Sequence, residues 1–216
     1  RSGATSIPEA LRLVPGVDVA QIDPNKWAIG IRGFNGRFSS KLLVMIDGRS
    51  VYTPTFSGVY WENQDYLMED IERIEVIRGP GATLWGANAV NGIINVITRD
   101  TSETKGGVAS FAKGNELKGL GEFRYGGELS DTANYRIYAK AKHLDEGVST
   151  KREPQDNDGK YFQVGFRADW QRSNDQWFTF LGEAYKNEFS QVHYIPRANG
   201  PHENTEGEVD NTFHHY

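Results

Sequence analysis

The stretch that most constrains the fold is a strand, turn, short helix and strand pattern over residues 71–99, IERIEVIRGPGATLWGANAVNGIINVITR. Apolar and charged residues alternate from Ile71 to Arg78, as they do on a half-covered strand. Residues 78–81, Arg-Gly-Pro-Gly, must end that strand, because proline lacks an N–H group and glycine admits positive φ. Residues 82–85 allow about one helical turn. Residues 93–97 form a second β-prone run.

The preceding residues predict further short elements of the same small domain. Ser6 and Glu9 have the spacing of a capping box, in which each side chain binds the other residue's N–H, so a helix should begin near Ile7. Strands are expected over 27–31 and 42–46, with a hairpin turn at Asp47-Gly48. Short helices mixed with short strands predict an α+β domain over residues 1–99.

Two loops of this domain combine aromatic and cationic residues. They span residues 35–40 (NGRFSS) and 53–61 (TPTFSGVYW). Their side chains would suit a flat or catecholate-like ligand through stacking and cation–π contacts. The alternative is that two or three of the aromatic residues only pack beneath the loops. The candidate ligand-binding residues are Arg37, Phe38, Phe56, Tyr60 and Trp61.

The residue pattern of the sequence changes after Arg99. Residues 100–107 read as a polar linker, and about five alternating segments follow, over 108–112, 117–129, 135–143, 161–170 and 177–185. One face of each segment is apolar and the other is charged. Short connections alternate with a long polar one at 144–160, which favours strands of an outer-membrane barrel over a soluble sandwich. In such a barrel Phe162, Val164 and Phe166 would face lipid, whereas Gln163 and Arg167 would face the lumen.

Composition and missing motifs exclude several functions. The net charge of −5 gives no reason to expect nucleic acid, and the chain has no cysteine. No apolar run approaches the ~18 residues of a membrane-spanning helix. No phosphate-binding loop or catalytic motif occurs, so neither an enzyme nor a cofactor is predicted. Residues 190–216 read as a polar loop, and the spacing of His193, His202, His214 and His215 there fits no standard metal motif.

The stretch 71–99 resembles the end of the plug domain of TonB-dependent outer-membrane receptors. The segment from Ser6 to Val17 and the hairpin at residues 44–49 resemble earlier parts of the same domain. The resemblance implies a plug at 1–99, a linker at 100–107 and the first barrel strands at 108–216. The matching residues, in order, are Glu72, Arg73, Glu75, Arg78, Gly79, Pro80, Trp85, Gly86, Gly92, Asn95 and Thr98.

The resemblance also implies a function and partners. Such receptors lie in the outer membrane of Gram-negative bacteria and import a ferric siderophore, haem or cobalamin with energy delivered by TonB. A ferric siderophore is the first expectation here. Arg32 and Arg78 match arginines that the family holds against the inner barrel wall, and they should lie close together. The family's TonB-contacting segment and most of its 22 barrel strands are missing, so we expect a fragment. The competing hypothesis is a secreted β-rich binding or adhesion module.

Overall fold

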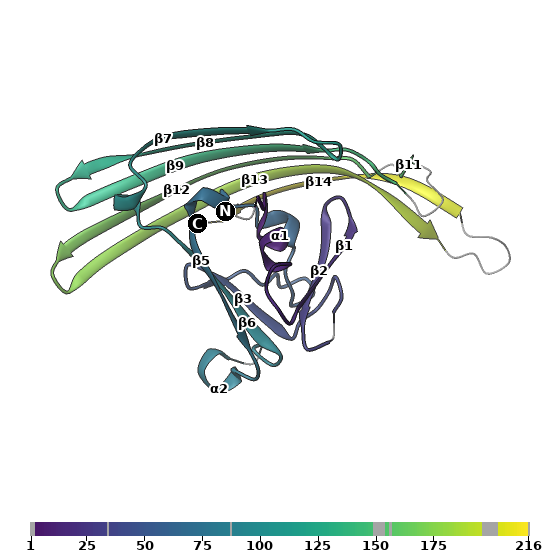
Figure 1. Ribbon diagram of the computed structural model, residues 1–216, viewed down its shortest axis with the longest axis horizontal. Helices are drawn as coiled ribbons and strands as arrows, with labels where there is room; N and C mark the ends of the chain where they lie inside the picture. The colour runs from purple at the N-terminus through teal and green to yellow at the C-terminus, as the bar shows by residue number, and fades with distance from the viewer. Residues whose placement is uncertain are drawn as a thin grey trace. The chain divides into compact units, whose positions relative to one another are not determined.

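The computed structural model describes residues 3–33, 35–86, 88–148, 154–155, 157–195 and 203–215. For residues 148, 154–155, 191–195 and 203–215 it describes the backbone alone. The chain divides into two compact units, Arg1–Asp100 and Thr101–Tyr216. Figure 1 labels the elements of both units.

The first unit is a small α+β domain built from a hairpin and a mixed sheet. Strands β1 and β2 pair antiparallel, with Val17 opposite Ile31. The second sheet has the order β4-β3-β6-β5, in which only the β3–β6 pair is parallel. The elements are α1 (Ile7–Leu11), β1 (Val17–Asp23), β2 (Lys26–Ile31), β3 (Leu42–Ile46), β4 (Arg49–Ser50), η1 (Trp61–Asn63), η2 (Met68–Asp70), β5 (Ile71–Arg78), α2 (Ala82–Trp85) and β6 (Gly92–Thr98).

The pattern predicted for residues 71–99 is confirmed, because β5, α2 and β6 occupy it in the expected order. The central strands β3 and β6 are covered on both faces, so they read as continuous apolar runs. The hairpin turn after β3 is also confirmed. Its two residues, Asp47 and Gly48, have φ of 48° and 78°, the left-handed values that such a turn requires.

The expected capping box between Ser6 and Glu9 at the start of α1 is wrong, because Glu9 binds Thr5 instead of Ser6. Ser6 makes no capping hydrogen bond through its side chain. Glu9 instead reaches one residue further back, where its Oε2 accepts hydrogen bonds from the Thr5 N–H at 2.6 Å and the Thr5 hydroxyl at 3.0 Å. The helix still begins at Ile7 with Pro8 in its first turn, where the missing N–H is harmless.

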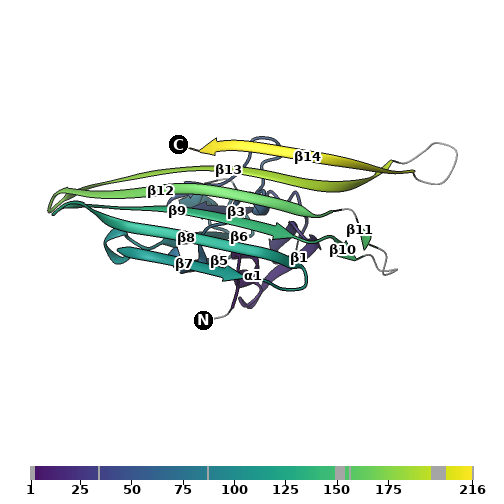
Figure 2. The same ribbon diagram turned by 90° about the horizontal axis from the view of Figure 1, so that it is seen from above.

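The second unit is a single antiparallel sheet of six strands in the order β14-β13-β12-β9-β8-β7. Figure 2 shows this sheet from above, with the tight β8–β9 and β12–β13 turns at one end. Each of those turns leaves two residues between strands, whereas 14 residues separate β9 from β12. The elements are η3 (Thr101–Glu103), β7 (Gly106–Ala112), β8 (Leu117–Ser130), β9 (Ala133–Leu144), β10 (Gly147–Val148), β11 (Pro154–Gln155), β12 (Gly159–Ser173), β13 (Gln176–Ile195) and β14 (Glu203–His215).

The apolar face of this sheet is exposed and its polar face is covered, the reverse of a soluble sandwich. Along β12, Phe162, Val164 and Phe166 are exposed, whereas Gln163 is 5% exposed. The polar side chains bind one another across strands. The Gln163 amide donates to the Tyr138 hydroxyl at 3.2 Å and to Glu183 at 3.2 Å. On the same face the buried Lys140 ammonium lies 3.0 Å from Glu122. The predicted alternation is therefore confirmed.

The prediction of a polar loop over residues 190–216 is wrong. Strand β13 continues to Ile195, and β14 pairs with it from Glu203↔Ile195 to His215↔Glu183. Both strands carry polar residues on both faces there, so the sequence lacks a period-two apolar signal, while backbone pairing needs none. His202 lies outside the described residues, and the side chains of the other three histidines are not described. The first strand of the sheet begins at Gly106, inside the expected linker.

Candidate ligand-binding site

The loop that follows β4 is closed by its own backbone. The Thr53 N–H donates to the Gly58 carbonyl at 2.8 Å, and the Ser57 N–H donates to the Thr53 carbonyl at 3.0 Å. Ser57 has φ of 56°, in the left-handed region that a tight turn requires. Val51, Val59 and Trp61 are buried on either side of the turn and anchor it to the core.

The two candidate loops touch at Gly58. A Cβ atom at this position would lie 2.9 Å from the carbonyl oxygen of Ser39, which belongs to the loop 35–40. It would also collide with the ring of Phe56, which lies over the glycine. The absence of a side chain at Gly58 therefore lets the loops approach closely and lets the Phe56 ring fold back.

Three aromatic rings and one guanidinium meet between these loops. Phe56 packs edge-to-face against both Phe38 and Tyr60, with ring centroids 4.9 Å apart in each pair. The Arg37 Cζ atom lies 5.6 Å from the Phe38 ring centroid and 5.8 Å from that of Tyr60, within cation–π range. Phe38 is 61% exposed. We call these four residues, Arg37, Phe38, Phe56 and Tyr60, the aromatic cage.

Trp61 does not share this surface and packs beneath the loop, as the alternative interpretation of these aromatic residues allows. It is 6% exposed and belongs to the core of the first unit, with β-strand residues such as Ile29 and Val44. The preceding Tyr60 remains half-buried at the cage. Tyr60 has an extended backbone and η1 begins at Trp61, so the chain changes conformation between the half-buried tyrosine and the buried tryptophan. Trp61 supports the loop from beneath.

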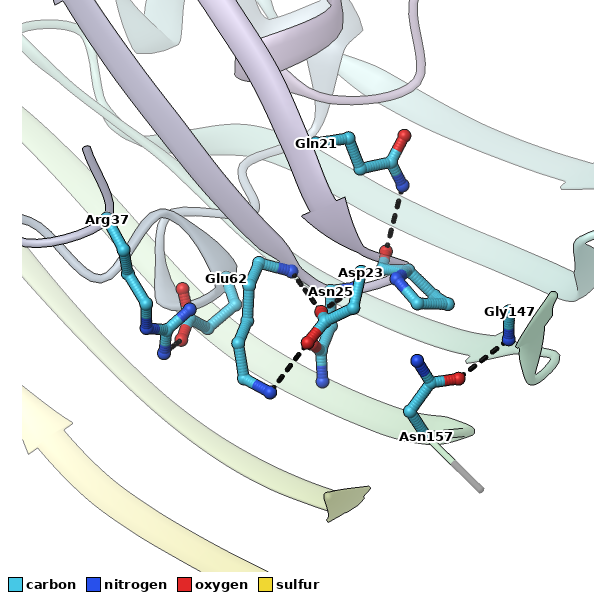
Figure 3. Close-up of polar contacts among 9 residues, drawn as sticks. Gln21, Asp23, Asn25, Arg37, Glu62, Gly147 and Asn157 are labelled. Carbon is cyan, nitrogen blue, oxygen red and sulfur yellow. Dashed lines mark hydrogen bonds and ion pairs between the residues drawn. The ribbon is translucent and has the colours of Figure 1, made fainter. Parts of the chain in front are cut away.

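A buried ion pair holds the cage cation. The Arg37 Nη2 atom donates to the Glu62 carboxylate at 2.8 Å, and the Glu62 side chain is 6% exposed (Figure 3). Burial raises the pKa of Glu62, and the charges of Arg37 and Lys26 oppose that rise without cancelling it. Lys26 in turn pairs with Asp23 at 2.7 Å. The sequence analysis identified neither Glu62 nor the Asp23–Lys26 pair. Only the Asp23–Lys26 pair has a local signal in the sequence, its spacing of three residues across a turn.

Arg32 follows β2, and its guanidinium lies near the end of β5, where Arg78 is the last residue. The Arg32 Nη1 atom lies 3.9 Å from the position that a Cβ of Gly79, the neighbour of Arg78, would occupy. Both arginines are exposed, and Arg32 adopts φ of 57°. The Arg78 Nη1 atom donates to the Pro15 carbonyl at 2.8 Å. Within the part of the chain that the structure describes, neither guanidinium has a carboxylate partner.

Two kinds of feature are absent from the described residues. No group of three or more His, Asp or Glu side chains there could hold a metal ion. None of the helices described is long and apolar enough to cross a membrane. The aromatic cage combines three aromatic rings with one guanidinium that is paired to Glu62.

These features define a class of protein. A small α+β domain with two aromatic loops is followed by long antiparallel strands whose apolar face is exposed. Comparison with known proteins gives the family. Residues 1–93 match the family model for the TonB-dependent Receptor Plug Domain. Residues 1–93 are therefore a plug domain of the TonB-dependent receptor family, and the strands that follow share the fold of a solved outer-membrane receptor.

Two curated relatives come from Vibrio species. The vitamin B12 transporter BtuB of Vibrio vulnificus is 34% identical over 117 residues, which is 53% of this chain and 18% of the relative. The iron-regulated outer membrane virulence protein of Vibrio cholerae is 34% identical over 152 residues, 65% of this chain and 22% of the relative. The chain thus spans about a fifth of the length of these relatives.

A solved structure shares the fold. The pyoverdine outer membrane receptor FpvA of Pseudomonas aeruginosa superposes with a TM-score of 0.66 at 18% identity, over 87% of this chain and 26% of that one. These relatives are transporters and receptors rather than enzymes, in agreement with the prediction from motifs.

Proposed function

We propose that this chain is the plug and the first barrel strands of a transporter that takes up a scarce nutrient complex, with a ferric siderophore as the first candidate. Residues 1–99 form the plug, and after a short linker the strands from Gly106 onward form the beginning of the barrel. Energy comes from TonB, which contacts a segment ahead of the plug helix. Outer-membrane lipid surrounds the strands.

The observation that carries this proposal is the aromatic cage on two adjoining loops of a plug domain. Stacking rings around one guanidinium suit the flat, conjugated faces of metal chelates. A relative named for vitamin B12 transport and another named as iron-regulated support a metal complex as cargo. Arg37, Phe38, Phe56 and Tyr60 contact the cargo, and Trp61 holds Tyr60 in place. The competing secreted module is disfavoured, because its apolar strand faces would be exposed to water.

The test uses the full-length receptor in detergent and a panel of ferric siderophores, haem and cyanocobalamin. Binding of one member and its TonB-dependent uptake by cells support the proposal. Phe38→Ala and Tyr60→Ala should each weaken that binding about tenfold or more, as expected for the loss of a stacked ring. Phe111→Ala removes an exposed ring from β7 and serves as the control. No binding of any panel member, or unchanged affinity in both loop variants, would contradict the proposal.

We also propose that Arg32 and Arg78 contact carboxylates of the barrel wall, because two cations without acidic partners form a docking point for anions. Arg32→Gln should lower the urea midpoint of plug unfolding in the full-length receptor, since Arg32 has no bonded partner within the described residues of this chain. Lys41→Gln removes another exposed charge from the same unit and is the control. An equal midpoint for Arg32→Gln and the wild type would refute the contact.

A further inference from the structure

Two ion pairs lie next to the aromatic cage. Arg37 pairs with Glu62 at 2.8 Å and Lys26 pairs with Asp23 at 2.7 Å. The two pairs belong together, because the charge of Lys26 also acts on Glu62. Figure 3 labels Asp23, Arg37 and Glu62 in one view. These four side chains carry two positive and two negative charges.

The Arg37 guanidinium therefore offers no free charge to an incoming ligand. Its Nη2 is bonded to Glu62, and its plane lies within reach of the Phe38 and Tyr60 rings. Its Nη1 is buried and has no hydrogen-bond partner among the described residues. A cation beside a carboxylate acts on distant charges as a dipole, whose field falls faster than that of a lone ion. An incoming ligand would therefore contact the aromatic rings, and chiefly that of the exposed Phe38.

We propose that Glu62 is a specificity-determining residue that neutralises Arg37, so that the cage selects a metal complex with an uncharged apolar face over an anionic complex. This inference rests on the proposed function and narrows its cargo. Ring stacking and buried apolar area supply the affinity for an uncharged face. An anionic face would lose hydration at the rings without gaining a net positive partner.

Glutamine at position 62 separates this role from a purely structural one. It keeps the shape of the side chain and an oxygen that can accept from Arg37 Nη2, while it removes the negative charge. The four side chains of the two ion pairs then carry one more positive than negative charge. Asp23→Asn has the same effect on the sum of charges and preserves an acceptor for the backbone N–H groups that Asp23 binds.

The experiment measures binding to the full-length receptor at about pH 8, where carboxylates are ionised. The probes are two ferric complexes of similar size, a neutral tris-hydroxamate and a trianionic tris-catecholamide. Glu62→Gln should bind the trianion about tenfold or more tightly than the wild type does, and the gain should shrink as salt is raised. Affinity for the neutral probe should stay unchanged. Asp23→Asn should shift the trianion in the same direction.

Two controls retain or remove charge without unmasking Arg37. Glu62→Asp keeps the carboxylate and should gain no affinity for the trianion. Glu69→Gln removes an exposed carboxylate of the same unit and should also gain none. The double variant Arg37→Gln/Glu62→Gln should lose the gain, because no cation is left to unmask.

The outcomes are distinct. The proposal is overturned if neither Glu62→Gln nor Asp23→Asn gains affinity for the trianion, or if both probes shift alike. A gain that persists in the double variant also overturns it. Failure of the proposed function looks different, because the wild type then binds no nutrient complex of the panel. Trianion binding by the charge variants still tests the role of Glu62 in that case.

Discussion

Burial and ion pairing act in opposite directions on Glu62. Loss of hydration raises the pKa of its carboxyl above the ordinary value of 4.5, and the attraction of Arg37 does not fully compensate. The folded protein therefore retains the Glu62 proton to a higher pH than the unfolded chain does. Where only the native state is protonated, stability falls as pH rises. The stabilisation is complete below the unfolded pKa and is lost through the higher, folded pKa.

This sign leads to a prediction about pH. The difference in unfolding free energy between the wild type and Glu62→Gln should decrease as pH rises from about 4.5 toward neutral, because glutamine does not titrate. Denaturant titrations of the full-length receptor at several pH values, followed by tryptophan emission, would measure it. Glu69→Gln, at an exposed position, should give a flat difference over the same window. A difference that increases with pH would show that ion pairing prevails over burial.

Gly58 is the residue on which the shape of the cage depends. An alanine methyl group would collide with the Phe56 ring and lie 2.9 Å from the Ser39 carbonyl. We expect Gly58→Ala to turn the Phe56 ring away from Phe38 and Tyr60, with loss of about 1–3 kcal/mol of stability through overpacking. A crystal structure and the unfolding free energy would test both effects. Gly36→Ala is the matched control, because no atom lies within 4 Å of its added Cβ. An undisturbed Phe56 ring in Gly58→Ala would refute this account.

At the scale of elements, Asp47 links the β3–β4 turn to the end of β6. Its carboxylate accepts the Thr98 N–H and the Thr98 hydroxyl, each at 2.8 Å. Its backbone N–H donates to the Val96 carbonyl at 3.0 Å, and its φ of 48° suits Asp or Asn better than Ala. This one residue thus combines turn geometry with a clip across the parallel pair of strands.

Removing the clip should destabilise the first unit. Asp47→Ala loses two hydrogen bonds and forces alanine into a left-handed conformation, so we expect a loss of roughly 2–4 kcal/mol. Hydrogen exchange at the Thr98 amide should quicken in parallel. Asp47→Asn keeps the turn preference and one acceptor, and should lose about half as much. Equal exchange at Thr98 in the wild type and Asp47→Ala would show that the clip is not needed.

The sequence predicted the elements whose signals are local. Residues 71–99 were assigned correctly because alternation, Arg-Gly-Pro-Gly and the β-branched run each act over a few neighbours. β14 was missed, because its pairing with β13 leaves no apolar pattern to read. In the site, the loop composition pointed to Arg37, Phe38, Phe56 and Tyr60. Glu62 escaped notice because its partner Arg37 lies 25 residues away and only the fold joins them.

At the scale of the whole molecule, the placement of polar and apolar faces decides what surrounds the sheet. Water-soluble sheets bury their apolar face. Here the exposed residues of the apolar face include Phe123, Ile137, Phe162, Phe166, Trp170 and Phe180. The opposite face holds the Lys140–Glu122 pair and the Gln163–Glu183 contact. An apolar band of this kind is stable only against lipid or another apolar partner, as the family's membrane location requires.

Labels along β12 would test this arrangement in the full-length receptor. Spin labels at positions 162, 164 and 166 should be reached by oxygen dissolved in lipid, whereas labels at 163 and 167 should be reached only by polar reagents, because successive side chains alternate between faces. An arginine at position 164 near the middle of the membrane should cost about 2–4 kcal/mol, and less near an interface. Lipid contact at 163 and 167 instead would mean that the strand is shifted by one residue, which exchanges all faces at once. The buried contact of Gln163 with Tyr138 and Glu183 makes that exchange unfavourable, because it would place three polar groups in hydrocarbon.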